Sequence, residues 1–305
     1  GDATGGAGDG DRAASPACRE RVVSALTDRD VDGIRTRSDG RERTYTGNSV
    51  GLLRAAGRFV ERVAFHDAGL AERARRDPVA AARGATGRAG AVSRIAAESG
   101  LAAGAARVSE QSPNAGDGEP GRDPDASLSG LRAFEGPTVS RALVARRPPA
   151  DATLVTAYDL PTGADVRRYI TDDGPVYHLT PVSHGLDADA TATLAAAYDL
   201  LANGSVGGGS RAPERAVRRV ATDGDPVETL TRVLTRHTRG LGVFEHLFAD
   251  QRVSDVVASA PVTDSRVRVA VDGERLRTNV RLPPDGAAAL GPRSLRQVRP
   301  SFPRR

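Results

Sequence analysis

The side chains in this sequence with the most obvious chemistry are arginines, because the chain has no lysine and all 43 of its basic residues are arginine. A phosphate-binding loop of the GxxxxGK[ST] type needs a lysine that reaches the β- and γ-phosphates. The sequence therefore excludes ATP hydrolysis by a P-loop within these 305 residues. Arginine carries a permanent charge and a planar fork of donors, which suits contacts to phosphate or carboxylate. A GC-rich coding sequence is the simplest reason for arginine in place of lysine.

Histidine, cysteine and serine offer no second reactive site. No histidine lies at ligand spacing to a cysteine or carboxylate, so no metal site is expected; the five are His66, His178, His184, His237 and His246. The single cysteine, Cys18, cannot form an internal disulfide and is interpreted as a small buried hydrophobe. Ser183, His184 and Asp187 have the residue types of a hydrolase triad. They are neighbours on one turn and no GxSxG motif is present, so no triad is expected.

The charge balance favours a mixed, solvated surface over a nucleic-acid partner. The net charge is +4 with a pI near 9.8, but 39 acidic residues are interspersed among the arginines. No apolar run approaches the ~20 residues that a membrane helix needs, and the first residues do not resemble a signal peptide. We expect a cytoplasmic protein. Because the sequence contains no methionine, we also expect residue 1 not to be the native start.

The composition along the chain predicts an α+β protein with two folded parts. Residues 1–15 are rich in Gly and Asp and are expected to be disordered. Residues 16–103 read as a mainly helical module, and residues 104–130, which contain few apolar side chains, read as a linker. Residues 131–290 are expected to form a small mixed α/β domain. Residues 291–305 are interpreted as a tail that does not fold.

In the helical module, residues 31–45 predict a hairpin that turns at Ser38-Asp39-Gly40. A strong helix follows, capped by Asn48 or Ser49, with an apolar stripe at three- and four-residue spacing. Helix-like pieces are expected at 70–76, 79–83 and 92–101.

In the second part, the runs 154–160, 166–170 and 176–179 predict a meander of short strands. Asp187 caps a helix that ends at Asn203-Gly204, and Asp225-Pro226 with Glu228 resembles a capping box that starts the next helix. That helix ends at Gly240, and a short helix follows at 243–248. The final strands are expected at 253–260, 266–271 and 275–282, the last two joined by the Asp272-Gly273 turn.

Three segments of the second part carry a family resemblance. They are Thr238 to Asp250 (TRGLGVFEHLFAD), Val253-Ser254-Asp255, and Arg268 to Val280 (RVAVDGERLRTNV). This pattern resembles the N-terminal domain of the type II/IV secretion ATPases, the motors of type II secretion, type IV pili and the archaellum. The similarity is clear from Tyr177 to Leu290 and is closest to the branch of halophilic archaea. Proteins of that branch are usually acidic, whereas this chain is basic.

The resemblance implies both a site and partners. In this family the N-terminal domain packs over the nucleotide bound to the next domain, and its arginines approach the γ-phosphate. By this resemblance Arg275, Arg277 and Arg281, and less directly Arg239, are the nucleotide-contacting candidates, whereas Arg266 is expected to contribute little. The alternative is that they face solvent on an exposed strand.

The cofactors of the intact family are ATP and Mg, and none is expected in this chain alone. The implied partners are the missing P-loop domain, the neighbouring subunits of a hexameric ring and a membrane platform protein. The implied location is the inner face of the cell membrane.

The resemblance stops at Leu290. Codons can be chosen for residues 291–305 that, read one nucleotide later, encode Ala-Arg-Asp-Arg-Phe-Ala-Lys-Ser-Gly-Arg-Pro-Phe-Pro-Asp, which is similar to the family's next segment. We therefore expect a frameshift near Leu290 and a truncated N-terminal portion of a motor ATPase, without enzymatic activity of its own. The alternative is a stand-alone adaptor that docks on a secretion platform.

Overall fold

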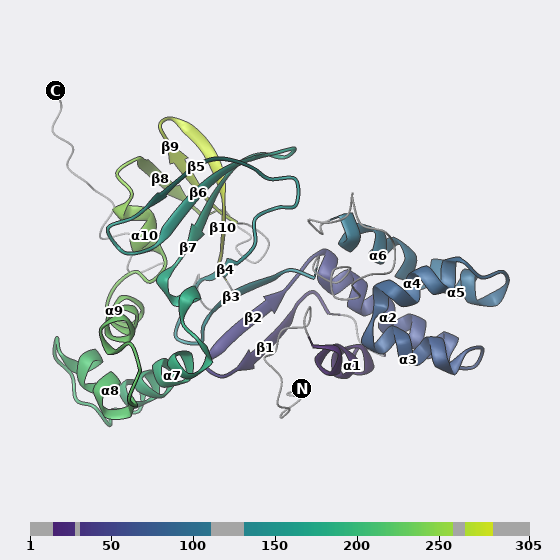
Figure 1. Ribbon diagram of the computed structural model, residues 1–305, viewed down its shortest axis with the longest axis horizontal. Coiled ribbons are helices and arrows are strands. Elements are labelled where there is room, and N and C mark those ends of the chain that lie inside the picture. Colours follow the sequence, from purple (N-terminus) through teal and green to yellow (C-terminus); the bar gives the residue numbers. More distant parts are fainter. Residues whose placement is uncertain (1–14, 28–30, 111–130, 259–265, 283–305) are drawn as a thin grey trace. The chain divides into compact units, whose positions relative to one another are not determined.

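The computed structural model describes residues 15–27, 31–110, 131–258 and 266–282 (Figure 1). It shows a mixed α+β protein, with a helical N-terminal region followed by a ten-strand mixed sheet and further helices. The chain forms two compact units. The first holds the residues up to Ser38, from Arg43 to Ala133 and from Pro149 to Asp151, and the remaining residues form the second. The expected disordered start and the C-terminal tail lie outside the described residues, apart from Ser15.

The first unit is built mainly from short helices. They are α1 (Pro16–Ala25), α2 (Asn48–Val63), α3 (Ala68–Arg76), α4 (Pro78–Thr86), α5 (Ala91–Glu98) and α6 (Leu101–Glu110). Of these, α1, α3 and α4 begin at a side-chain cap. The carboxylates of Asp67 and Asp77 each accept a backbone N–H three residues on, at 2.8 Å, which fixes the starts of α3 and α4. The strong helix α2 is confirmed, but the predicted cap at Asn48 or Ser49 is wrong. The helix already includes Asn48, and its cap is Gly47, which offers no side chain.

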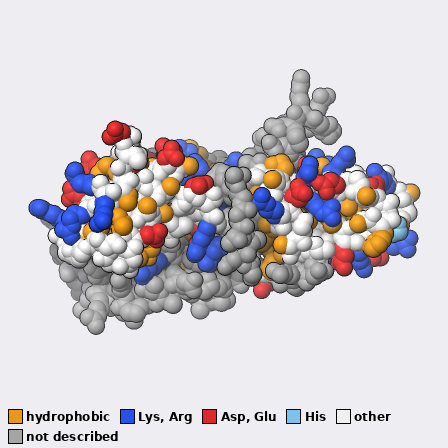
Figure 2. All heavy atoms as spheres, turned by 90° about the horizontal axis from the view of Figure 1, so that it is seen from below, with side chains coloured by type: hydrophobic (Ala, Val, Ile, Leu, Met, Phe, Trp, Pro, Cys, Tyr) orange, Lys and Arg blue, Asp and Glu red, His pale blue; other side chains and the backbone are white. Residues whose placement is uncertain are grey.

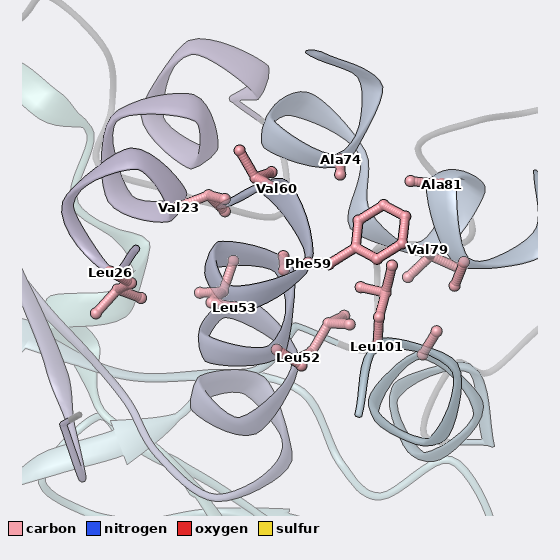
Figure 3. Packing of buried hydrophobic residues seen from close by; sticks show 14 of the residues in the cluster. Val23, Leu26, Leu52, Leu53, Phe59, Val60, Ala74, Val79, Ala81 and Leu101 are labelled. Atoms are coloured by element: carbon pink, nitrogen blue, oxygen red, sulfur yellow. The ribbon is translucent and has the colours of Figure 1, made fainter. Parts of the chain in front are cut away.

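The core of the first unit surrounds α2. Figure 3 shows the ring of Phe59, on α2, pointing toward Val79 of α4 and Leu101 of α6. The helices approach closely because small residues stand at their crossings. A Cβ on Gly104 of α6 would lie only 3.2 Å from the Cα of Leu52.

The expected start of the linker at residue 104 is wrong. Helix α6 continues to Glu110, and Ala105 and Val108 are buried in the core. This part of the helix was not predicted because its apolar residues are mostly alanine, and an Ala- and Gly-rich composition resembles that of a flexible segment. Residues 111–130, the rest of the expected linker, lie outside the described residues.

The predicted hairpin is confirmed as β1 (Ile34–Ser38) and β2 (Arg41–Tyr45). Its tip, Asp39–Glu42, belongs to the second unit. Asp39 and Gly40 have φ values of 48° and 72°, and the Gly40 carbonyl accepts the N–H of Thr138 at 2.8 Å. Gly40 lies so close to Thr191, on the first long helix of that unit, that an added Cβ would stand 2.3 Å from the Thr191 carbonyl oxygen. This position therefore requires glycine.

The strands of the sheet follow the order β1-β2-β3-β4-β10-β7-β6-β5, with β9 paired to β10 and β8 to β9. Strands β5, β6 and β7 form the predicted antiparallel meander, and β10 pairs in parallel with β7. Strands β3 and β4 were not predicted from the sequence. The strands of the second unit are β3 (Ala133–Pro137), β4 (Leu143–Ala145), β5 (Thr153–Asp159), β6 (Asp165–Thr171), β7 (Gly174–Thr180), β8 (Val253–Val257), β9 (Arg266–Val271) and β10 (Glu274–Arg281).

The helices of the second unit are a short 3-10 turn η2 (Val182–Gly185), α7 (Ala188–Ala202), α8 (Ala212–Val220), α9 (Val227–Thr238) and α10 (Phe244–Ala249). Asp187 caps α7 as predicted, accepting the N–H of Ala190 at 2.8 Å. The capping box at Asp225 is wrong. The Asp225 carboxylate instead accepts the N–H of Thr222 at 2.7 Å, because the turn before the helix lies within its reach.

Two apolar clusters stabilise the second unit. One joins the sheet to α10 through residues such as Tyr177, Val269 and Leu247. The other holds α7, α8 and α9 together around Leu194 and Leu230. Within the described segments, the structure contains no helix of the length and apolarity that crossing a membrane requires.

Candidate anion-binding face

The β9–β10 hairpin presents one apolar and one charged face. Its turn, Asp272-Gly273, has φ values of 53° and 85°, the left-handed pair that the sequence signal predicts. Val267, Val269 and Val271 of β9 are almost fully buried and belong to the core of the sheet. Because side chains alternate along a strand, the residues between them project from the opposite face.

That opposite face gathers five arginines. In the strand register, Arg277 of β10 lies directly across from Arg268 of β9, and Arg281 lies across from Arg266. Arg275 precedes Arg277 by two residues and so shares its face. We call Arg266, Arg268, Arg275, Arg277 and Arg281 the arginine face.

The charges of the arginine face act on one another. Desolvation by the surrounding protein lowers the pKa of Arg266. The charges of Arg277 and Arg281 lower it further, whereas Asp173 raises it. Asp173 forms an ion pair with Arg277 at 3.3 Å. The guanidinium carbons of Arg266 and Arg281 both lie over the ring of Phe134, at 5.8 and 5.2 Å from its centre. The ring thus holds two like charges close together.

Acidic residues at the hairpin turn are engaged elsewhere. Asp272 and Glu274 lie 3.7 and 3.0 Å from the guanidinium of Arg168 on β6. This contact ties the turn to the meander.

The Thr-Asn part of the recognised pattern holds β10 in place. Strand β10 pairs with β7 up to Thr278 and with β4 from Val280. The Thr278 hydroxyl donates to the Val267 carbonyl of β9 at 2.6 Å, at the irregularity in the register. The side chain of Asn279 bonds to backbone groups of β7 and β4. Both residues are buried, so their role is to fix the strand that carries the arginines.

The glycines and glutamate of the TRGLGVFE segment form the turn between α9 and α10. The Gly242 N–H donates to the Arg236 carbonyl at 3.0 Å, and an added Cβ on Gly240 would overlap the Glu245 carboxylate. Glu245 accepts from the Arg236 side chain at 3.2 Å and from the Leu241 N–H at 3.0 Å. The spacing of this segment therefore serves the packing of the two helices.

Asp250, the last residue of that segment, is buried beneath two tyrosines. Its Oδ2 accepts the hydroxyls of Tyr158 at 2.7 Å and of Tyr177 at 2.9 Å. Burial and then the nearby Asp250 raise the pKa of Tyr158 to about 12, and the same causes raise that of Tyr177. The guanidinium of Arg252 lies 4.1 Å from the centre of the Tyr158 ring. The tyrosines thus stay protonated and act as hydrogen-bond donors that satisfy a buried carboxylate.

The structure brings together three of the four predicted arginines and adds two. Arg275, Arg277 and Arg281 share the arginine face, whereas Arg239 ends α9 and donates to the Gly209 carbonyl. Arg266 was expected to contribute little, yet it lies opposite Arg281. Counting back across the Asp272-Gly273 turn would have identified Arg268. Arg266 was hidden by the irregularity in β10, which shifts the register by two residues.

The structure also places the serine, histidines and cysteine that were considered for catalysis or metal binding. Ser183 and His184 are buried in η2, and Asp187 caps α7, so the three do not form a triad. Burial lowers the pKa of His184 and His237 to about 4 and that of His246 to about 3. Cys18 lies half-buried on α1. In the part of the chain that the structure describes, no three His, Cys, Asp or Glu side chains converge as metal ligands would.

No family model matches this chain, and no curated protein matches it either.

Proposed function

We propose that this chain is the N-terminal portion of a type II/IV secretion-system motor ATPase, and that its arginine face meets the triphosphate of a nucleotide held by a P-loop domain. The observation that supports this most directly is the register of β9 and β10, which sets Arg277 against Arg268 and Arg281 against Arg266. Three members of the face, Arg275, Arg277 and Arg281, are the residues that the family resemblance singles out.

The chemistry of the face suits a polyphosphate. Like charges directly opposite each other in a sheet destabilise it, by roughly 0.2–1 kcal/mol for a typical cross-strand pair. An anion between the strands reverses this cost, and guanidinium groups can offer paired donors to its oxygens. A triphosphate in the transition state of hydrolysis needs this kind of charge stabilisation. Phe134 restricts two of the guanidinium groups before the anion arrives.

The rest of the unit supports a mechanical role. The Asn279 side chain fixes β10 to β7 and β4, and Arg168 of β6 pairs with Asp272 and Glu274 at the hairpin turn. A hairpin held this firmly moves with its unit as a body. In the intact motor we propose that nucleotide state, sensed by the arginine face, sets the position of this unit against its neighbours in a ring. The work would be protein secretion or assembly of a pilus or archaellum.

The first test is the coding sequence beyond the Leu290 codon. A Walker A motif in the adjoining frame supports the motor proposal. A stop codon without a P-loop supports the alternative, a stand-alone adaptor that uses this fold to dock on a secretion platform.

The second test measures Mg-dependent ATP turnover of the longer protein. Arg277→Ala should lower turnover by well over tenfold, as expected for an arginine that stabilises transferring phosphate. Arg232→Ala is the matched control. Arg232 is an exposed arginine of α9 whose side chain contacts Thr229, and its removal should leave turnover within twofold. Equal turnover in the two variants would contradict the proposed site.

A further inference from the structure

Three arginines converge on the glycine-rich loop that precedes α8. Arg215 donates to the carbonyls of Gly207 and Gly208 at 2.7 and 3.1 Å. Arg219 donates to the Ser205 carbonyl at 3.4 Å, and Arg239, from the end of α9, donates to the Gly209 carbonyl. The guanidinium groups of two helices thus contact one short loop. Positions 207–209 of this loop are glycines and carry no side chain.

The loop leaves space above it. A Cβ placed on Gly207, Gly208 or Gly209 would meet no atom within 4 Å. The three arginines are exposed, so their charges face solvent around this space. Figure 2 shows arginine side chains projecting at the left-hand end of the molecule, where Figure 1 places α8.

The guanidinium groups are oriented but not saturated. Each has five N–H donors, and the loop carbonyls use one or two of them. Their hydrogen bonds to the loop orient these long side chains, and such orientation lowers the entropic cost of binding a ligand. A further exposed arginine of α8, Arg218, differs because it pairs with Glu214 at 3.1 Å.

We propose that Arg215, Arg219 and Arg239 form a binding site for a phosphate group over the loop Ser205–Gly209. Three converging cations match an anion with three or more oxygens better than a carboxylate with two. A nucleic acid is less suited, since neither α8 nor α9 carries a Phe, Tyr or Trp on which a base could stack. The phosphate can be free or can belong to a lipid headgroup. This site shares no residue with the arginine face and does not depend on the motor proposal.

The binding test uses the chain as it is. Inorganic phosphate and pyrophosphate are titrated into the labelled protein in a chloride buffer, and the amide signals of Gly207, Gly208 and Gly209 are followed by NMR. Vesicles of equal parts phosphatidylcholine and phosphatidylglycerol, with pure phosphatidylcholine as reference, distinguish a lipid headgroup from free phosphate. Saturable shifts at these glycines, with either phosphate source, are the expected result.

Variants assign the binding to the three arginines. Arg215→Ala, Arg219→Ala and Arg239→Ala should each weaken phosphate binding about tenfold, since one charge-assisted hydrogen bond is lost. Arg218→Ala should change it less than twofold. Arg215→Gln keeps a donor for the loop carbonyls while removing the charge, so it should weaken binding without loosening the loop.

Four outcomes would overturn the proposal. One is the absence of binding to phosphate and to both kinds of vesicle. Another is an equal loss of affinity in Arg218→Ala and Arg215→Ala, which would indicate a diffuse charge effect. The third is a single-stranded oligonucleotide that binds through these arginines more than tenfold more tightly than pyrophosphate. Variants that only lower the melting temperature, with phosphate affinity unchanged, would show that the arginines serve the loop alone.

Discussion

The side chain of Asn279 pairs with both backbone groups of Leu179. Its Oδ1 accepts the Leu179 N–H at 2.8 Å, and its Nδ2 donates to the Leu179 carbonyl at 2.9 Å. The same Nδ2 donates to the Ala145 carbonyl of β4 at 2.8 Å. The amide thus replaces backbone pairing where β10 leaves β7 and joins β4. Only a side chain with both a donor and an acceptor at this length can do so.

We predict that Asn279→Ala destabilises the protein by about 3 kcal/mol or more, because buried backbone groups of Leu179 and Ala145 lose their partner. Urea unfolding followed by circular dichroism measures this change. Asn203→Ala is the control. Asn203 also accepts a backbone N–H, that of Ser205, but in an exposed turn, so its loss should cost less than about 1 kcal/mol. Similar unfolding midpoints for the two variants would contradict this role of Asn279.

Gly40→Ala tests the contact between the tip of the hairpin and α7. The residue has a φ of 72°, and the new Cβ would stand 2.3 Å from the Thr191 carbonyl oxygen. The control, Gly174→Ala, adds a Cβ at a φ of 104° with no atom within 4 Å. Gly174→Ala should cost about 1–2 kcal/mol from backbone strain alone. Gly40→Ala should cost several kcal/mol more, as measured by urea unfolding. An equal cost in the two variants would mean that the backbone of the hairpin tip shifts to accommodate the new Cβ.

The predictability of the fold varied with the kind of signal. Valines alternating with arginines predicted β9 to the residue, and the Asp-Gly turn predicted its hairpin with β10. Helix α8 was missed because its buried residues include Ala212 and Ala216, which carry a weak apolar signal, and because a glycine run precedes it. Strand β4 has only three residues, too few for a period-two pattern.

The candidate site was predictable in its residue type and only partly in its members. Arg275, Arg277 and Arg281 could be placed on one face from their even spacing. Arg266 and Arg268 can be placed opposite them only when the register of β9 and β10 is known. That register depends on Thr278 and Asn279, which fill an irregularity in β10 that no local sequence pattern predicts. Arg239 could be placed at the end of a helix but not against its contact, Gly209, since that contact is made across a loop.

Acidification should destabilise the protein before carboxylates begin to titrate. Burial, aided for two of them by Arg236, lowers the pKa of His184 and His237 to about 4 and that of His246 to about 3. Between pH 6.5 and about 4 the unfolded chain therefore binds protons that the folded chain does not. The stabilisation is complete above pH 6.5 and is lost as the pH falls, by ~1.4 kcal/mol per pH unit for each histidine.

Urea unfolding at pH values from 7 to 5 measures this loss. His246→Gln removes one of the three titrating groups, so its stability should fall less steeply with acidification than that of the wild type. A wild-type stability that is flat across this range would contradict the assignment of three neutral buried histidines.

Because of the arginine face, the protein should be more stable at high ionic strength than at low ionic strength. The opposed pairs Arg277–Arg268 and Arg281–Arg266 repel each other, and added salt screens this repulsion. Arg268→Thr removes one charge and places a β-branched residue in the strand, so it should raise stability at low ionic strength by about 0.5 kcal/mol. The gain should shrink as sodium chloride is added. Thermal unfolding across a salt series gives both quantities.

The same substitution tests whether the arginine face binds nucleotide phosphate. If the repulsion is retained for contact with nucleotide phosphate, Arg268→Thr should be stabler than the wild type yet slower in ATP turnover once the P-loop domain is present. Arg218→Thr is the opposite case, because it breaks an attractive pair with Glu214 and should bring no gain at low salt. A stabilised Arg268→Thr protein with undiminished turnover would show that the opposed arginines on β9 and β10 serve neither the nucleotide nor the motor.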